Sequence, residues 1–567
     1  MVAEPKKCGI LLEDPTLSQG KADAILRAER ITGDRNGVPQ DTREKCTGGD
    51  LLITKNQIRK NLYFDSVTLM VASSMMRGLD GVVNAAVMMG TDHNRSLMTQ
   101  AGLIGPDTEP FGVNDTVVGI QAESEEAAQA AITFFDDYIG GKKKDAQGAG
   151  ERRARTLAAA KTACPELNFT VISVPGRYAR AEAEKAMELG MHVLMFSDNV
   201  SLEDEVALKK TALEKGLLMM GPDCGTTIIN GTALGFANVV RRGNIGLAAA
   251  AGTGLQEVTA LIDQLGGGVS QALGTGGRDL KEEVGGRMMS LCLEALNEDP
   301  ETEVIVILSK PPAQSVMQKM LEQLEGVDKP VIAAFLGGDP TLLEGSRVVW
   351  AGDLEQAARL AVLAARGEEP KLPAGDDSML NALAEEEAAK LNPEQKYLRG
   401  LYSGGTLCYE TILLLREAGI PTWSNIALDK NYLLDGGAAS RENTLLDMGD
   451  DFFTNGLPHP MIDFRQRVDR MEREAADPSV GVLLLDCVCG YGTHADPAGE
   501  LAPAIRKAKE IAAQGGRHLT VIASVTATEA DPQVRSVQLR RLEEAGAIVM
   551  SCNAQAARLA ALMLKQM

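Results

Sequence analysis

Two turns rich in glycine and threonine are the parts of this sequence best suited to bind an anion. They read Ala251-Gly252-Thr253-Gly254 and Ser403-Gly404-Gly405-Thr406, and a shift of 153 residues superimposes their Gly-Thr pairs. Each turn follows a short apolar segment and opens an amphipathic one, so each should present the free N–H groups and the positive dipole end of a helix. We expect both turns to contribute to one phosphate or substrate site. Tight packing of a strand against a helix is the alternative explanation.

Charged side chains near these turns could help to bind a substrate. Gly276-Gly277-Arg278 follows the next apolar segment, and the Arg278 guanidinium is shaped for a bidentate contact with a carboxylate. Lys310 ends another apolar segment, where it could pair with a phosphate or carboxylate, or be solvated. Glu257 and Glu410 lie in the first turns of the two expected helices, so stabilisation of the helix dipole and catalysis are both open explanations.

The segment from Asp447 to Asp463 combines acidic residues with a histidine. Asp447, Asp450 and Asp451 follow an apolar segment closely, and three such carboxylates could hold Mg²⁺. Substrate binding, metal binding and helix capping are all open explanations. His459 lies between two prolines that restrict its backbone, and it could act as a general acid or base that protonates a leaving amide nitrogen. The catalytic candidates are therefore His459, Asp450 and Asp451.

Three other histidines and two cysteines are expected to be structural. His93 and His494 lie in turns, and His192 begins an apolar strand, as is typical of a hydrogen-bonded core histidine. Cys487 and Cys489 would point to the same face of a strand, where burial in the core is expected ahead of metal binding or redox chemistry.

Each glycine turn opens the same succession of elements. After the expected helix comes an apolar strand, then a helix that ends at Asp299-Pro300 or Asp477-Pro478, then a continuous apolar strand, and then further helices and strands. Continuous apolar strands are typical of parallel sheets buried on both faces. This alternation predicts an α/β fold with two tandem flavodoxin-like domains, at 241–366 and 396–567, joined by a linker at 367–395. Such domains bind ligands at the carboxyl ends of their strands, where the two turns lie.

The region before the repeats predicts two smaller α/β domains. Residues 51–140 alternate strands and helices as in a small α/β sandwich, and a charged linker rich in Gly and Ala follows to about residue 161. Residues 162–240 have the pattern of half a Rossmann sheet, but no GxGxxG fingerprint is present. Residues 1–50 show weak periodicity and form an N-terminal extension of unknown role.

Composition excludes several classes of function. The 567 residues carry a net charge of −21 without one basic stripe, which argues against a nucleic-acid partner. Nine cysteines at irregular spacing do not form a disulfide framework and indicate the reducing cytoplasm. No run of about 18 apolar residues occurs, so we expect a soluble protein without membrane contact.

Longer motifs resemble the FdrA family over residues 51–567. They include Phe196-Ser197-Asp198-Asn199-Val200, Gly221-Pro222-Asp223-Cys224-Gly225-Thr226, Leu308-Ser309-Lys310-Pro311-Pro312 and the whole segment from Asp447 to Asp463. That family is in turn similar to succinyl-CoA synthetase, whose two power helices aim their N-termini at a phosphate. The resemblance implies that Gly252-Thr253 and Gly405-Thr406 open these helices, and that Gly221, Pro222 and Cys224 belong to the cofactor-binding turn. It also implies that residues 162–240 are a CoA-binding-type domain and that the two repeats are ligase-type domains.

Two departures from succinyl-CoA synthetase weigh against its chemistry. The glycine loop that grips CoA is not evident, and the Gly-His-Ala-Gly segment that carries the phosphohistidine is missing. The corresponding segment from Leu336 to Gly345 contains no histidine. CoA is therefore a doubtful cofactor, and a phosphohistidine relay is not expected.

The FdrA resemblance instead implies a subunit of oxamate carbamoyltransferase in allantoin and purine breakdown. That reaction converts oxalurate and phosphate to oxamate and carbamoyl phosphate, with partner subunits on separate chains. It implies an oligomeric complex that binds a small carboxylate and phosphate. An NDP-forming acyl-CoA synthetase and a non-catalytic scaffold subunit stay open as alternatives.

Overall fold

The computed structural model describes residues 52–567 apart from short gaps at 63, 65, 92–93, 96–97, 100, 106–107, 149–153, 155, 374–376 and 455–456. The predicted N-terminal extension and His93 lie outside the described residues. The chain divides into two compact units, Met1–Ala149 and Gly150–Met567. Within the described part, no helix is long and apolar enough to cross a membrane.

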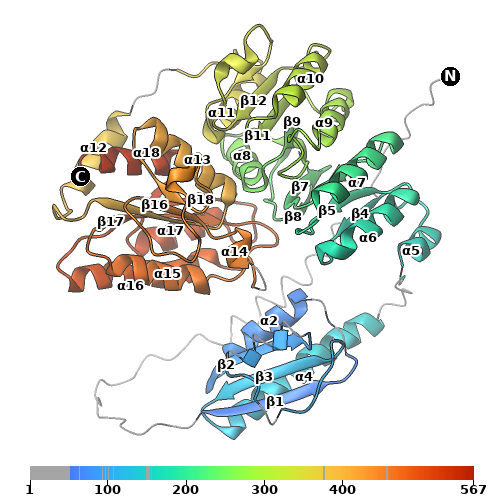
Figure 1. The fold of residues 1–567 in the computed structure, drawn as a ribbon, viewed down its shortest axis with the longest axis vertical. Coiled ribbons are helices and arrows are strands. Elements are labelled where there is room, and N and C mark those ends of the chain that lie inside the picture. The colour runs from blue at the N-terminus through green and yellow to red at the C-terminus, as the bar shows by residue number, and fades with distance from the viewer. Residues whose placement is uncertain are drawn as a thin grey trace. The chain divides into compact units, whose positions relative to one another are not determined.

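The first unit contains an antiparallel sheet on which the helices α2 (Ser66–Arg77) and α4 (Glu125–Gly148) pack (Figure 1). The strands β1 (Ile53–Arg59), β2 (Val82–Met89) and β3 (Thr116–Ala122) pair in the order β1-β3-β2. The helices α2 and α4 bury their apolar residues against the sheet. The linker expected from residue 140 begins inside α4, because Lys, Ala and Gln residues continue the helix without a proline to stop it.

The second unit begins with α5 (Leu157–Ala163) and half of a Rossmann-like sheet. The parallel strands β4 (Phe169–Ile172), β5 (His192–Met195) and β6 (Met219–Met220) lie in that order, with α6 (Gly176–Glu188) and α7 (Leu202–Lys215) as the crossovers. The sheet ends earlier than the expected boundary at 240. The hairpin of β7 (Thr226–Ile229) and β8 (Thr232–Gly235) pairs instead with the next sheet, because its apolar face is buried there at an otherwise open edge.

The first repeat is a parallel sheet extended by that hairpin. Its strand order is β13-β12-β11-β9-β10-β7-β8, and β9 to β13 are all parallel. The order of these five strands is the flavodoxin-like 2-1-3-4-5 that the sequence predicted. The elements are β9 (Arg242–Ala249), α8 (Gly252–Gln264), β10 (Val269–Gly274), α9 (Arg287–Glu298), β11 (Val304–Ser309), α10 (Gln314–Leu324), β12 (Val331–Phe335), β13 (Val349–Trp350) and α11 (Leu354–Ala365).

The second repeat has the same strand order with one extra strand. Its order is β15-β16-β14-β17-β18-β19, all parallel. The elements are β14 (Tyr397–Tyr402), α13 (Gly405–Glu417), β15 (Trp423–Ser424), β16 (Thr444–Asp447), α14 (Asp451–Thr454), α15 (Arg465–Ala476), β17 (Val480–Val488), α16 (Pro497–Gln514), β18 (Thr520–Thr526), α17 (Arg535–Glu544), β19 (Ile548–Met550) and α18 (Asn553–Leu564). The expected linker between the repeats contains a further helix, α12 (Ser378–Ala388), which packs on α18.

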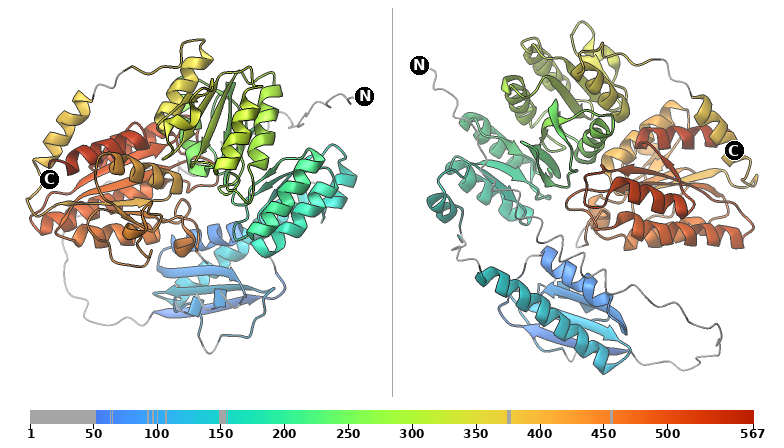
Figure 2. Two further views of the ribbon diagram at one scale, coloured as in Figure 1. Left: turned by 45° about the horizontal axis from the view of Figure 1, so that its top comes forward. Right: turned by 180° about the vertical axis from the view of Figure 1, so that it is seen from behind.

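The two repeats lie side by side (Figure 2), and they share one hydrophobic core. One helical layer of each repeat, α8 with α11 and α13 with α18, contributes to this core, which contains Leu255, Ala358, Leu407 and Leu559. The helices on the far faces form separate cores with their own sheets. Because α8 and α13 are packed in the shared layer, their N-termini are brought to the same edge of the two sheets.

Candidate functional site

The two glycine turns lie side by side. The Thr406 N–H donates a hydrogen bond to Thr253 Oγ1 at 3.3 Å. Glycine permits this approach: a Cβ added to Gly254 would lie 2.8 Å from Thr406 Cγ2, and one added to Gly404 would lie 3.1 Å from Thr253 Cγ2. The N-termini of α8 and α13 therefore meet across the boundary between the repeats.

The turn before α13 is occupied by a carboxylate of the same chain. Asp486, at the end of β17, accepts hydrogen bonds from Ser403 N at 2.9 Å, Gly404 N at 2.7 Å and Ser403 Oγ at 3.0 Å. Arg467 from α15 donates to Asp486 Oδ1 at 2.6 Å and to the Leu401 carbonyl. Sequence reasoning missed Asp486. Its signal was the single charged residue in the apolar strand Val480–Val488.

A second carboxylate lies against the start of α13. Asp447 ends β16 and accepts a hydrogen bond from Gly449 N at 2.9 Å. A Cβ on Gly405 would lie 2.5 Å from Asp447 Oδ2, so only glycine fits there without displacing the carboxylate. Burial, with the charges of Asp450 and Asp486 adding to it, raises the pKa of Asp447 to about 7. Near neutral pH this carboxyl can therefore both donate and accept a proton.

Lys310 reaches this region from the first repeat. Its Nζ lies 4.3 Å from the centroid of the Tyr409 ring of α13, a cation–π contact between the repeats. Burial lowers the pKa of Lys310, and the nearby Asp447 carboxylate opposes that shift. The structure thus brings Lys310 toward Asp447 and the start of α13, near the two turns.

His459 is a neutral imidazole at physiological pH. Its Nδ1 accepts a hydrogen bond from Met461 N at 3.2 Å, so the ring hydrogen is on Nε2. The ring lies 5.5 Å from that of Phe236, and burial lowers the pKa of His459 to about 4. Nε2 lies 2.8 Å from the position that a Cβ on Gly449 would occupy. His459 is therefore suited to donate a hydrogen bond rather than to act as the general acid or base that the sequence suggested.

The other acidic residues of this segment serve mainly as caps. Asp450 accepts a hydrogen bond from Phe452 N at 3.1 Å at the start of α14, and Asp463 pairs with Arg465. Asp451 is the exposed first residue of α14. Over the described ranges, no group of three or more His, Cys, Asp or Glu side chains is arranged to hold a metal ion. Asp447, Asp450 and Asp451 therefore do not form the three-carboxylate Mg²⁺ site that the sequence suggested.

Arg278 binds a carboxylate within its own chain. Its Nε lies 2.7 Å from Glu205 Oε2 of α7, and its Nη2 donates to the Val200 carbonyl at 2.9 Å. The fully buried Lys209 joins the same network through Glu205 at 2.8 Å and Asp279 at 2.9 Å. These ion pairs attach the Rossmann-like sheet to the first repeat. A Cβ on Gly276 would lie 2.6 Å from the Pro222 carbonyl oxygen, so this loop packs directly on the Gly221-Pro222 turn.

Cys224 is a buried thiol. Its Sγ lies 3.4 Å from the Gly274 carbonyl oxygen, and burial raises its pKa to about 11. The thiolate, which is the nucleophilic form, is therefore rare at neutral pH. Cys487 and Cys489 are also buried in the core of the second repeat.

The remaining candidates are structural. His192 Nδ1 accepts a hydrogen bond from Leu218 N at 3.0 Å, which confirms the expectation of a satisfied core histidine. His494 Nδ1 accepts from Asp496 N at 3.1 Å before α16. Glu257 and Glu410 are buried, and both carboxylates accept backbone N–H groups of the opposite repeat.

The start of α6, where a Rossmann-like fold would place the pyrophosphate of CoA, is packed against backbone. A Cβ on Gly176, the first residue of α6, would collide with the carbonyl oxygens of Asp198 and Asn199. Only glycine permits this close approach, and the turn from Val174 to Arg177 has a single glycine and no glycine loop.

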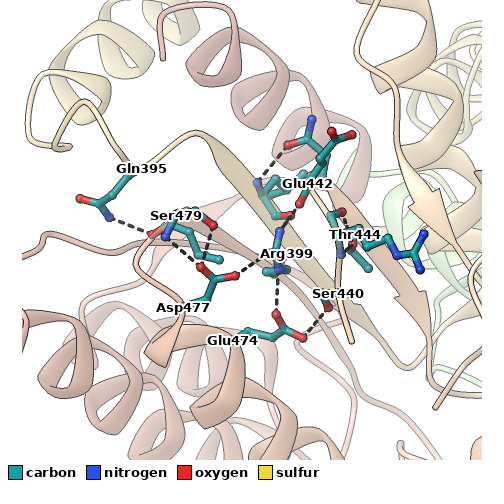
Figure 3. Close-up of polar contacts among 12 residues, drawn as sticks. Gln395, Arg399, Ser440, Glu442, Thr444, Glu474, Asp477 and Ser479 are labelled. Carbon is teal, nitrogen blue, oxygen red and sulfur yellow. Dashed lines mark hydrogen bonds and ion pairs between the residues drawn. The ribbon is translucent and has the colours of Figure 1, made fainter. Parts of the chain in front are cut away.

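A separate polar network lies at the opposite end of the second sheet (Figure 3). Arg399 on β14 is 2% exposed and pairs with Glu474 at 2.7 Å and Asp477 at 2.9 Å. A hollow of about 380 Å³ lies beside it, lined in part by Gln395, Pro478 and Arg517. This end of the sheet holds the amino ends of the strands, away from the glycine turns.

Two family models match parts of the chain. One, described as CoA-ligase, covers residues 401–563, and the other, described as AllF, heavy metal-associated domain, covers residues 52–155. The second segment contains no cysteine. A soft metal would therefore lack thiolate ligands in it.

One relative is similar to this chain over most of its length, and two others are similar over a third of it. The uncharacterized protein YahF of Escherichia coli strain K12 is 44% identical over 504 residues, which cover 89% of this chain and 97% of YahF. The ADP-forming sulfoacetate-CoA ligase subunit SqwL of an Acholeplasma species is 26% identical over 196 residues, 33% of this chain and 64% of the relative. The mitochondrial ADP-forming succinate–CoA ligase subunit alpha-2 of Trichomonas vaginalis is 29% identical over 199 residues, 33% of this chain and 61% of the relative. The chain thus spans somewhat over three fifths of these two ligase subunits.

Proposed function

This chain belongs to the family of the Escherichia coli protein YahF, and we propose that it is a subunit of a carbamoyltransferase with a CoA-ligase-like fold. The proposed reaction converts oxalurate and phosphate to oxamate and carbamoyl phosphate, as in the breakdown of allantoin. The partner subunits are separate chains. The phosphate binds where the N-termini of α8 and α13 meet.

One observation supports the proposal best. Two helix N-termini meet at this site, and no histidine of the described residues is placed there to carry a phosphoryl group. Helix N-termini stabilise phosphate and the charge that develops on an acyl phosphate. Four of the five histidines lie in the described residues, and His459 is the one that lies near the turns. Its Nδ1 is engaged by Met461 N and its Nε2 carries the hydrogen, so neither nitrogen offers a free lone pair to phosphorus. A direct attack of phosphate on the substrate needs no such relay.

The proposed step forms one bond, breaks one bond and transfers one proton. An oxygen of hydrogen phosphate forms a bond to the carbamoyl carbon of oxalurate. The bond from that carbon to the oxamate nitrogen breaks, and its electron pair goes to the nitrogen. The nitrogen takes one proton and leaves as the amide of oxamate, while the phosphate loses one.

The side chains near the turns suit this step. The Asp447 carboxyl, with its pKa of about 7, donates the proton to the leaving nitrogen and recovers it from the phosphate. Lys310 pairs with the substrate carboxylate. The Nε2–H of His459 donates a hydrogen bond to the oxygen that becomes negative in the transition state.

The test is phosphorolysis of oxalurate by the full chain co-purified with its partner subunits, with carbamoyl phosphate measured through ATP formation by added carbamate kinase and ADP. Product that depends on both oxalurate and phosphate supports the proposal. No product from the full complex would contradict it. Acyl-CoA formation that depends on CoA and a nucleotide would favour a CoA ligase, and no binding of phosphate, CoA or oxamate in calorimetry would favour a scaffold subunit.

A glycine substitution links activity to the turn. In Gly405→Ala the new Cβ must displace the Asp447 carboxylate, so we expect activity to fall by at least about a hundredfold. The matched control is Gly326→Ala, in a loop of the first repeat where the nearest atom to the new Cβ is 3.5 Å away. Full activity in Gly405→Ala would argue against a site at this turn.

A further inference from the structure

We propose that Phe236 is a positioning residue for His459: its ring, supplied by the first repeat, keeps the imidazole of the second repeat in one orientation and away from water. This inference rests on the hydrogen bond that the proposed function assigns to His459, and it names the residue that prepares that donor. Phe236 directly follows β8. It lies outside both glycine turns and outside the acidic segment, so no sequence motif marks it.

Phe236 is the middle member of a row of three rings that ends at His459. The ring centroids of Phe196 and Phe236 are 5.4 Å apart, and those of Phe236 and His459 are 5.5 Å apart. The ring planes are tilted by 53° and 39°, and these distances are typical of favourable contacts between aromatic rings. Phe196 directly follows β5. The row therefore runs from the Rossmann-like sheet through the first repeat to the second.

Close packing fixes the place of Phe236. Its N–H donates to the Gly225 carbonyl at 2.7 Å, and Thr226 Oγ1 donates to the Phe236 carbonyl at 2.7 Å. A Cβ added to Gly492 of the second repeat would lie 3.0 Å from Phe236 Cδ1. One added to Gly235 would lie 2.3 Å from the Gly225 carbonyl oxygen. Both the backbone and the ring of Phe236 are thus held where only glycine fits beside them.

Hydrogen bonds of neighbouring residues keep the phenylalanine ring and the imidazole together. Tyr491 N donates to the carbonyl of Ala237, the residue after the phenylalanine, at 2.8 Å. His494 N, in the same loop, donates to the Met461 carbonyl at 2.8 Å. Met461 N in turn donates to His459 Nδ1 at 3.2 Å. The loop that follows β17 therefore attaches to both partners of the ring contact.

The direction of the His459 donor depends on a neutral imidazole. Met461 N–H occupies Nδ1, so a second proton on the ring would place a hydrogen on Nδ1 against that N–H. The ring would then have to turn, and Nε2–H would leave its present direction. An apolar neighbour favours the neutral form, because exclusion of water disfavours the charged one.

Two carboxylates of the second sheet act against the neutral form of His459. The charge of Asp486 raises the pKa of His459. Asp447 faces the same region, because a Cβ on Gly449 would lie 2.8 Å from His459 Nε2 and 3.2 Å from Asp447 Oδ1. Burial outweighs these charges and lowers the pKa of His459 to about 4. Loss of the Phe236 ring should admit water and let the two carboxylates stabilise the imidazolium.

The test is the titration of His459 in the full chain without substrate. NMR of histidine labelled with ¹³C in the side chain follows it, and His459→Gln assigns the signal. In the parent chain the signal should not titrate between pH 5 and 8. In Phe236→Ala we expect the midpoint to rise by at least about one pH unit, to above pH 5. Phe236→Leu keeps an apolar side chain and should stay within about half a pH unit of the parent chain.

Tyr432→Leu is the matched control. Tyr432 is also partly buried, and its ring lies 5.5 Å from that of Trp423 on β15, the outer strand of the second sheet. Its removal should leave the His459 midpoint unchanged. An unchanged midpoint in folded Phe236→Ala overturns the inference, and so does an equal rise in Tyr432→Leu. Thermal unfolding shows which variants are folded. If Phe236→Ala does not fold, Phe236→Val is measured instead, and an unchanged midpoint there also overturns the inference.

The kinetics of oxalurate phosphorolysis by the full complex give a second readout. His459 is proposed to bond an oxygen that becomes negative in the transition state, so loss of its orientation should lower kcat more than it changes KM. We expect kcat of Phe236→Ala to fall at least about tenfold with KM within about threefold, and Phe236→Leu to recover most of the loss. A higher KM at unchanged kcat would contradict the role of Phe236. Absence of carbamoyl phosphate from the parent complex would overturn the proposed function, whereas the titration without substrate would still decide whether Phe236 positions His459.

Discussion

Glu257 and Glu410 occupy equivalent positions in the two repeats, and each caps the last helix of the opposite repeat. Glu257 Oε1 accepts a hydrogen bond from Asn553 N, the first residue of α18, at 3.1 Å. Glu410 Oε1 accepts one from Leu354 N, the first residue of α11, at 2.8 Å. The exchange of caps ties the repeats together and so holds the starts of α8 and α13 in contact. The sequence left dipole stabilisation within their own helices and catalysis open for these two residues, whereas in the structure each carboxylate caps a helix of the opposite repeat.

Asn553→Ala should destabilise the second unit. The Asn553 Nδ2 group donates to Glu410 Oε2 at 2.7 Å and to the Leu407 carbonyl at 3.0 Å. Its loss leaves buried acceptors unpaired, which costs about 1–3 kcal/mol of unfolding free energy. Denaturant unfolding measures the change, and Ser551→Ala, at an exposed position two residues earlier, should stay within about 0.5 kcal/mol of the parent chain. Equal effects of the two variants would contradict a role for the Asn553 side chain in stability.

Stability should fall as the pH rises toward 8. Burial, with the charge of Asp353 adding to it, raises the pKa of Glu410 from 4.5 to about 8. The folded state holds this proton more tightly than the unfolded state, so its contribution is complete below about pH 4.5 and is lost as the pH rises through about 8. Unfolding free energies measured from pH 5 to 9 test this. Glu410→Gln, which cannot ionise, should be less stable at pH 6 but should depend less steeply on pH.

The proposed carbamoyl transfer should lose activity above neutral pH. Because Asp447 acts as the proton donor and its pKa is about 7, the active protonated form declines as the pH rises through that value. His459, with a pKa of about 4, remains neutral from pH 5 upward and should add no second transition there. Initial rates across this range give the profile. Asp447→Asn should lower the rate by about a hundredfold or more and remove the alkaline decline; an unchanged profile would exclude Asp447 as the acid.

Arg399→Met should strongly destabilise the second repeat. Removal of the guanidinium leaves the Glu474 and Asp477 carboxylates without their shared buried partner (Figure 3). The expected loss is about 3–5 kcal/mol of unfolding free energy. Arg465→Met is the matched control, because the Arg465 side chain is 62% exposed and its pair with Asp463 should contribute at most about 1 kcal/mol. A small loss of unfolding free energy in Arg399→Met would show that the network in Figure 3 contributes little to the stability of this sheet.

Alkylation should distinguish Cys164 from Cys224. Cys164 is exposed, whereas Cys224 is buried with a pKa raised to about 11. Treatment of the folded chain with iodoacetamide at pH 8, followed by peptide mapping, should label Cys164 within minutes and leave Cys224 unmodified. Both should react after denaturation. Rapid labelling of Cys224 in the folded chain would show an accessible thiolate at the Gly221-Pro222 turn and reopen its use in catalysis.

Much of the fold could be predicted from the sequence because its signals are local. Continuous apolar runs such as Val304–Ser309 and Val480–Val488 identify parallel strands, and their alternation with helices predicts a doubly wound sheet. The boundary at 240 could not be predicted in this way. The hairpin of β7 and β8 looks like a continuation of the preceding sheet, and only pairing with β10 assigns it to the next one.

The candidate site likewise combines features that could be predicted from the sequence with features that depend on the tertiary structure. The sequence by itself determined that two equivalent turns, at Gly252 and Gly405, open helices at the carboxyl ends of parallel strands, because helix starts and apolar periodicity depend on neighbouring residues. Only the tertiary structure decided that Asp486 occupies one of them, that His459 is neutral and that Arg278 pairs with Glu205. Burial and hydrogen bonds between residues more than 70 positions apart decide these three properties, and no local pattern of residue types records them.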